Sequence, residues 1–141
     1  MRAIQRFEVS LKAFIVRDGQ ALLLREADTG WWELPGGRID VGEEMVPHSD
    51  VLAREIAEEL GPDVRIEATD AAVSWVRRRP TDGVFLFLLA RVCAFAGGEM
   101  RLSDEHDDIR WVRPGEWAGL TLPPQSGYAD GLSRLAALAR L

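Results

Sequence analysis

Two stretches near the N-terminus, residues 8–17 and 20–26, carry hydrophobic patterns that predict neighbouring β-strands. In the first stretch apolar and polar positions alternate, as expected of a strand whose two faces differ. The second stretch is a short apolar run that ends in charged residues. Asp18-Gly19, a dipeptide typical of tight hairpin turns, lies between them. The alternating apolar residues are Val9, Leu11, Ala13 and Ile15, and the apolar run is Leu22-Leu23-Leu24.

A different period follows over residues 48–60, where apolar side chains recur every four positions. Leu52, Ile56 and Leu60 fall on one side of a helix at this spacing and predict its buried stripe. Gly61-Pro62 ends the pattern, because glycine is favoured just after a helix and proline cannot continue one. We therefore expect a helix here that packs against a core.

The rest of the chain alternates between strand and helix signals, without a repeat or a linker. Residues 64–79 and 84–95 predict a long hairpin, because Pro80-Thr81-Asp82-Gly83 supplies turn residues between them. Mixed strands with two helices predict a layered α/β domain, and the length suits a single domain over residues 1–141. The remaining expected elements are short strands over 31–34 and 108–112, a helical turn near 114–117 and an amphipathic helix over 129–141.

Composition narrows the range of partners. The chain has 23 acidic and 17 basic residues and a net charge of −6, which disfavours binding to a nucleic-acid polymer. The longest apolar run, Val84–Ala90, is too short to cross a bilayer, and the N-terminus lacks a signal-peptide pattern. Cys93, the only cysteine, is expected to be a small buried hydrophobe. We expect a cytoplasmic protein without a membrane partner.

The predicted helix also carries three carboxylates, Glu55, Glu58 and Glu59, at positions i, i+3 and i+4. Residues at this spacing share a helix face, and like charges there destabilise the helix slightly. A hard divalent cation with oxygen ligands offsets the repulsion. The spacing therefore predicts a Mg²⁺ site, with Mn²⁺ as a substitute and Glu59 as the first candidate ligand. The backbone carbonyl of Gly36 or Gly37 is a further candidate ligand, because glycine lets the chain approach a metal closely.

The surrounding residues complete a pattern that resembles the signature of the Nudix hydrolases, the Nudix box. In that family a glycine, a glutamate, an Arg-Glu pair, two further glutamates and a glycine follow one another at fixed spacing. The chain departs from this spacing between Glu43 and Arg54, where ten residues stand in place of the usual seven, and Pro62 replaces a bulky apolar residue. The matching residues are Gly37, Glu43, Arg54, Glu55, Ile56, Glu58, Glu59 and Gly61, preceded by Trp32-Glu33-Leu34-Pro35-Gly36.

The resemblance implies both a fold and a chemistry. The implied fold is a Nudix-type α/β/α sandwich with a mixed central sheet. The implied activity is Mg²⁺-dependent hydrolysis of a phosphoanhydride bond in a nucleoside diphosphate linked to another moiety, whether a nucleoside triphosphate, an ADP-ribose-like compound or a dinucleotide. The metal neutralises phosphate oxygens and lowers the pKa of bound water. By the same resemblance, Glu43 and Arg54 form a supporting ion pair beside the metal ligands Glu55, Glu58 and Glu59.

The general base has candidates in two places. In some Nudix enzymes it is a glutamate of the box, here Glu58 or Glu59, and in others it comes from a loop near the C-terminus. Glu105 stands six residues before Trp111, similar to the loop acid of such enzymes, and is expected to serve as a base or a metal ligand. His106 is a further candidate because imidazole titrates near neutral pH. A solvated acidic turn is the alternative interpretation of this loop.

Substrate contacts are expected from cations and aromatic rings. Arg25, Arg77 and Arg79 are candidates for binding phosphates, and Trp75 is a candidate for stacking on a base. A solvated strand end is the alternative for Arg77 and Arg79, and core packing is the alternative for Trp75.

Other functions are compatible with the same residues. A non-catalytic nucleotide-sensing or interaction module is the main alternative, because the insertion and Pro62 depart from the Nudix box. The three intact glutamates argue against it. Isoprenoid diphosphate isomerase chemistry, also known in the family, is disfavoured because Cys93 reads as a core residue. A homodimer is compatible with the sequence, with the N-terminal strand and the long hairpin as candidate contact surfaces.

Overall fold

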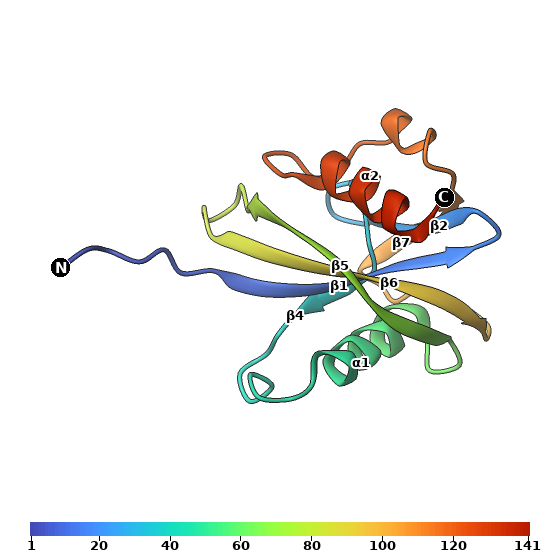
Figure 1. Ribbon diagram of the computed structural model, residues 1–141, viewed down its shortest axis with the longest axis horizontal. Helices are drawn as coiled ribbons and strands as arrows, with labels where there is room; N and C mark the ends of the chain where they lie inside the picture. The colour runs from blue at the N-terminus through green and yellow to red at the C-terminus, as the bar shows by residue number, and fades with distance from the viewer.

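A mixed β-sheet lies between two helices in the computed structural model, which describes residues 1–141 (Figure 1). The strands are β1 (Glu8–Arg17), β2 (Gln20–Glu26), β3 (Trp32–Glu33), β4 (Gly36–Arg38), β5 (Arg65–Arg78), β6 (Phe85–Gly97) and β7 (His106–Val112). The helices are α1 (His48–Leu60), the short 3₁₀ helix η1 (Trp117–Gly119) and α2 (Tyr128–Ala139). One long helix covers each face of the sheet, which confirms the expected α/β/α sandwich.

Strand β1 lies in the middle of the sheet and pairs with three other strands. One of its edges runs parallel to β6, which in turn pairs with β5. The other edge is divided, because Ser10–Lys12 pair with β4 and Val16–Arg17 pair with β2, both antiparallel. Strand β2 continues the sheet to β3 and β7. The divided edge sets Gly36 of β4 directly opposite Lys12.

Each face of the sheet has its own hydrophobic core. On one face α1 packs the predicted stripe against β1 and β2, and on the other α2 packs against β5, β6 and the neighbouring strands. Cys93 is fully buried on the α1 side, and burial raises the pKa of its thiol to about 11. The prediction that it is a buried hydrophobe is therefore confirmed. The buried hydrophobic side chains of the two helices are Val51, Leu52, Ile56 and Leu60 of α1 and Tyr128, Leu132, Leu135 and Ala136 of α2.

The loop between β4 and α1 holds the longer spacing of the box. It forms hydrogen-bonded turns, in which Glu43 N–H donates to the Asp40 carbonyl and Val46 N–H donates to the Glu43 carbonyl. The side chains of Val41 and Met45 in this loop are exposed to solvent. The loop therefore projects Val41 and Met45 outward while Glu43 remains held by its neighbours. Among all helices of the structure, none has the length and apolar character that a membrane crossing needs.

Candidate active site

The glycine turn, made of Gly36 and Gly37 at the start of β4, meets the C-terminal half of α1. The backbone N–H of Gly36 donates a hydrogen bond to the carboxylate of Glu59. A Cβ placed on Gly37 would overlap the carboxylate of Glu55, so the absence of a side chain lets the helix and the turn approach each other. Because Glu55 and Glu59 are four residues apart, one face of α1 presents both carboxylates to this glycine turn.

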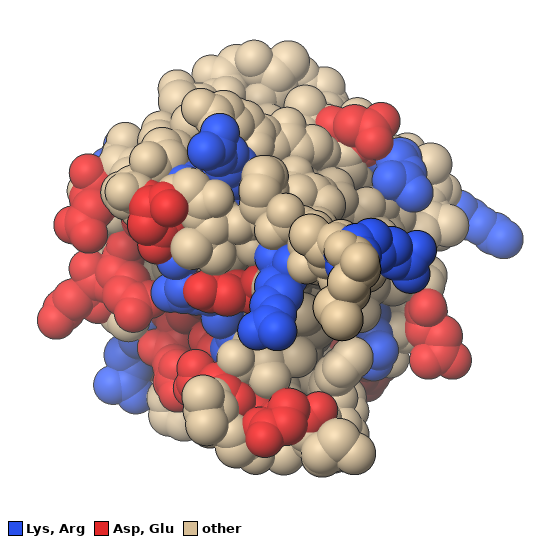
Figure 2. Space-filling model, turned by 90° about the vertical axis from the view of Figure 1, so that its left-hand side faces the viewer, with Lys and Arg blue, Asp and Glu red and all other residues tan.

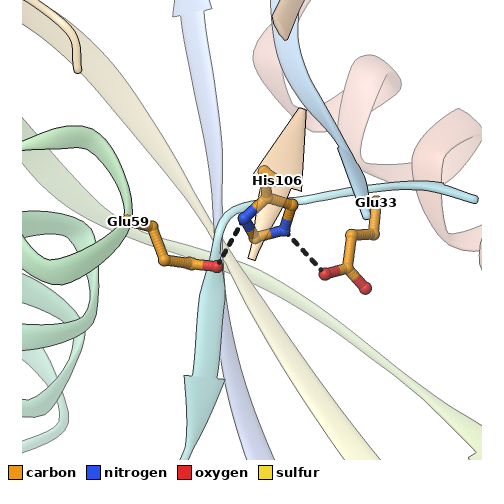
Figure 3. A group of neighbouring side chains, drawn as sticks. All are labelled: Glu33, Glu59 and His106. Atoms are coloured by element: carbon orange, nitrogen blue, oxygen red, sulfur yellow. Dashed lines mark hydrogen bonds and ion pairs between the residues drawn. The ribbon is translucent and has the colours of Figure 1, made fainter. Parts of the chain in front are cut away.

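Glu59 also belongs to a cluster of three buried side chains from three different elements, shown in Figure 3. The ring of His106, from β7, lies between Glu33 of β3 and Glu59 of α1. Its Nε2 is 3.1 Å from Glu33 Oε1, and its Nδ1 is 3.5 Å from Glu59 Oε2. The candidate ligand atoms all lie within 4.8 Å of one another. Carboxylate oxygens and an imidazole nitrogen at such separations suit a divalent cation.

Burial and neighbouring charges set the protonation of this cluster. Burial is the main influence on Glu59 and raises its pKa to about 7. Burial would also raise the pKa of Glu33, but Lys12 and the hydrogen bond with His106 outweigh it and lower that pKa. For His106, burial would lower the pKa, but Glu33 and Glu59 outweigh it and raise the pKa. Near neutral pH the cluster therefore combines an ionised Glu33 with a Glu59 close to its titration midpoint.

Arg54 joins the loop before α1 to the acidic face of the helix. Its guanidinium donates to both carboxylate oxygens of Glu43, over 2.6 and 2.5 Å, which is a bidentate pair. It also lies 2.9 Å from Glu55 and 3.0 Å from Glu58. One cation therefore offsets the repulsion among three carboxylates. Glu58 is 59% exposed and contacts Arg54, so it lies outside the buried cluster around Glu59.

A cavity rich in cations opens beside Glu33 and the glycine turn. Two of its cations already have acidic partners: Arg38 pairs with Glu8, and Arg79 pairs with Asp82. Figure 2, which views the end of the molecule where the N-terminal segment lies, shows basic and acidic side chains next to each other across the middle of this face. The structure thus places the predicted Arg77 and Arg79 in one wall. The charged lining residues are Lys12, Arg38, Arg77, Arg79, Glu26 and Glu33.

The acidic loop before β7 borders a second cavity, whose lining includes Glu105 and His106. Glu105 is exposed there, and its backbone carbonyl accepts a hydrogen bond from Ala27 N–H. Glu26 and Glu33 line both cavities. The loop acid and the cluster of cations therefore approach the same buried carboxylate, Glu33, from two directions.

Two predicted substrate contacts have other partners. Arg25 forms a 2.6 Å ion pair with Asp107 and lines neither cavity. Trp75 is only 7% exposed, and its ring packs edge-on against Tyr128 with the ring centroids 5.1 Å apart. It also abuts Gly131 of α2. The structure therefore supports core packing for Trp75, and the prediction that it stacks on a base is wrong.

Glu33 and Lys12 were not among the residues expected at the site. Both are buried, at 9% and 7% exposure, and both lie on strands next to the glycine turn. A charged residue in the middle of a strand that is covered on both faces is costly unless it has a partner or a role. That signal was present at Lys12, between the apolar residues Leu11 and Ala13.

Comparison with known proteins places this arrangement in a family. The NUDIX domain profile matches residues 7–130. A MutT-like protein of Streptomyces ambofaciens is 37% identical over 109 residues, covering 77% of this chain and 65% of that protein, so the match spans slightly less than two thirds of the relative. The nucleoside triphosphatase NudI of Salmonella arizonae is 31% identical over 116 residues, covering 74% of this chain and 80% of that protein.

The fold leads to the same group. The crystal structure of a MutT protein from Methanosarcina mazei Go1 superimposes with a TM-score of 0.72 at 25% identity, covering 99% of this chain and 100% of the other. The profile match extends from β1 to the start of α2 and includes every residue of the glycine turn, α1 and the cluster around Glu59. The chain therefore belongs to the Nudix hydrolase family.

Proposed function

We propose that this protein hydrolyses a phosphoanhydride bond in a nucleoside diphosphate linked to another moiety, with a divalent metal held at Glu59. The observation that carries the proposal is the position of Glu59. This carboxylate is buried, is fixed by the N–H of Gly36, and lies beside the imidazole of His106. Glu33, a neighbour of Glu59 in the same cluster, also lines a cavity that contains four cations. A cavity of this charge suits a polyanionic substrate.

The residues present fit a divalent ion. Glu59 and Glu33 supply carboxylate oxygens and His106 supplies a nitrogen, all within 4.8 Å of one another. Glu55, Glu58 and the carbonyl of Gly37 remain proposed ligands from the acidic side of α1, as their places in the Nudix box imply. A bound Mg²⁺ or Mn²⁺ would neutralise phosphate oxygens and lower the pKa of a coordinated water.

Side chains of the protein would bind the phosphates and accept the proton of the attacking water. Arg77 and Arg79 would offset the negative charge of the phosphates from the cavity wall. A carboxylate at the rim would accept the proton of the attacking water. Glu105, exposed beside His106 and Glu33, has the access that this role needs, and Glu58 and Glu59 are the alternative bases.

We further propose nucleoside triphosphates as the first substrates to test, ahead of ADP-ribose-like compounds and dinucleotides. Relatives named nucleoside triphosphatase NudI share 29–34% of aligned residues with this chain, and these matches cover 71–74% of it. The cytoplasmic location expected from the sequence stays a prediction, as does the Mg²⁺ dependence.

The test is phosphate release, coupled to a phosphatase, over a panel of triphosphates, sugar nucleotides and dinucleotides. Turnover of one class with Mg²⁺, its loss in EDTA and its absence in Glu59→Gln would support the proposal. A folded protein that binds Mg²⁺ but turns over nothing in the panel would contradict it and favour the nucleotide-sensing module. The long loop gives that alternative little support, because Glu43 still reaches Arg54.

A further inference from the structure

Lys12 is a buried cation with almost no hydrogen-bond partner. Its side chain lines the cavity beside the glycine turn, it is 7% exposed, and its ammonium donates only one long bond, of 3.5 Å, to the carbonyl of Gly36. No carboxylate lies within 4.0 Å of this nitrogen. The Lys12 ammonium therefore retains donors that point to no protein acceptor.

Arg77 of β5 faces the same cavity and is also unpaired. Its buried Nε has no hydrogen-bond partner, and no carboxylate lies within 4.0 Å of its guanidinium. The guanidinium carbon lies 5.3 Å from the ring centroid of Trp31, a cation–π contact that fixes the group without neutralising it. A buried donor that lacks a partner is costly, and two such cations in one cavity indicate an anionic ligand.

The acids in the same lining do not cancel these two cations at close range. Glu33 is held by His106, 3.1 Å away, and acts on Lys12 only through space. Burial is the largest influence on Glu26 and raises its pKa, which makes this carboxyl a weaker anion. Arg38 and Arg79 are already paired with Glu8 and Asp82. Lys12 and Arg77 are thus the two cations of the cavity that have no carboxylate partner.

The backbone of Gly36 connects this cavity with the metal-binding cluster. Its N–H donates to Glu59, and its carbonyl accepts from Lys12. A single residue therefore contacts both the carboxylate of Glu59 and the ammonium of Lys12. The cavity beside Lys12 and the cluster around Glu59 are therefore adjacent, which is the arrangement that consecutive phosphoryl groups of one chain require.

We propose that Lys12 and Arg77 form an anion subsite that binds the phosphoryl group next to the one at the metal. This assignment rests on the proposed function, because it takes the metal to lie at Glu59. The ligand class is a diphosphate or a longer phosphate chain, one phosphoryl group at the cluster and the next between Lys12 and Arg77. Lys12 and Arg77 position the substrate, and the reaction needs no proton from either of them.

The subsite is testable without turnover, by NMR titration of inorganic pyrophosphate into the protein in EDTA. We expect wild type to bind and Arg77→Gln and Lys12→Met to bind about tenfold more weakly or worse, since each loses a charge-assisted hydrogen bond. Arg78→Gln is the matched control, because Arg78 is the next residue of β5, lies over Phe85 and does not line the cavity. Circular dichroism verifies folding, and Arg77→Gln still tests the subsite if Lys12→Met does not fold.

A kinetic comparison separates this proposal from the proposed function. In an active enzyme, Arg77→Gln should raise KM for the substrate about tenfold with a smaller effect on kcat, while Arg78→Gln leaves both unchanged. Pyrophosphate binding that depends on Lys12 and Arg77, in a protein that hydrolyses nothing, would uphold the subsite and reject the hydrolase. Hydrolysis with wild-type KM in Arg77→Gln, or wild-type protein that does not bind pyrophosphate, would overturn the subsite.

Discussion

The carboxylate of Glu59 accepts a hydrogen bond from the backbone N–H of Gly36, which ties the buried end of α1 to the glycine turn at β4. This bond fixes one oxygen of the carboxylate. The other oxygen lies 3.5 Å from His106. The carboxylate of Glu59 is therefore held in place by the protein itself, so the proposed cation would require little reorganisation to bind there.

Replacing Glu59 by glutamine separates its charge from its shape. The amide retains an oxygen for the Gly36 N–H but cannot supply an anionic ligand. We expect Glu59→Gln to lower kcat by at least about 100-fold, with a Tm equal to or above that of wild type because a buried charge is removed. Glu58→Gln should lower kcat by a smaller factor, because Glu58 is 59% exposed and paired with Arg54. Steady-state kinetics and Mg²⁺ titration of both variants test this ranking, and equal losses would contradict it.

A methyl group at Gly37 tests the approach of the turn to α1. Gly37→Ala places a Cβ on the carboxylate of Glu55, the mobile end of a flexible side chain, so the displacement falls on Glu55 and spares the backbone. We expect kcat to fall about 10- to 100-fold with little change in Tm. Gly115→Ala is the matched control, because its Cβ meets nothing within 4 Å. Activity in Gly37→Ala equal to that of the control would show that the position of Glu55 is not critical.

The titration of Glu59 should appear in the stability of the metal-free protein. Its pKa is raised from 4.5 to about 7 by burial, so folding favours the protonated carboxyl. The associated stability is complete below pH 4.5 and is lost as the pH rises through about 7. In EDTA, the Tm of wild type should therefore fall relative to that of Glu59→Gln across this window. Parallel Tm curves for the two proteins would show that Glu59 titrates normally.

Gly131 of α2 provides a test of the core assignment of Trp75. Glycine to alanine within a helix usually stabilises by about 1 kcal/mol. Here the new Cβ would lie within 2.8 Å of three ring atoms of Trp75, so we expect Gly131→Ala to destabilise by about 1–3 kcal/mol instead. Urea unfolding measures whether Gly131→Ala raises or lowers the free energy of unfolding. A Trp75→Leu background should remove much of the penalty, and additive effects of the two changes would argue against the contact.

Local signals were sufficient to define most of the fold. The turn at Asp18-Gly19 and the stop at Gly61-Pro62 delimit β1, β2 and α1 at the residues expected from the sequence, and the long hairpin ends within two residues of its expected bounds. Strand β4 was missed, because Gly36–Arg38 carry no apolar alternation. This strand exists only because the divided edge of β1 offers Ser10–Lys12 as a partner.

The site was predictable only where its residues are neighbours on one element. The spacing of i, i+3 and i+4 predicted a common helix face for Glu55, Glu58 and Glu59. The cluster around Glu59 also contains Glu33 of β3 and His106 of β7. The spacing of residues along the chain does not show that these two strands place their side chains beside α1. The sequence therefore identified candidate ligands on α1 and His106 as a candidate base, but not that Glu33 and His106 lie next to Glu59.

The bidentate contact between Glu43 and Arg54 closes the long loop at its base. Lengthening the loop between β4 and α1, residues 39–47, by three residues costs only about 0.4 kcal/mol more, because closure entropy grows with the logarithm of length. Loop length and catalytic geometry are thus free to change independently. Exposed positions such as Val41 and Met45 can therefore be substituted to change what this loop contacts, while the Glu43–Arg54 pair keeps α1 in place.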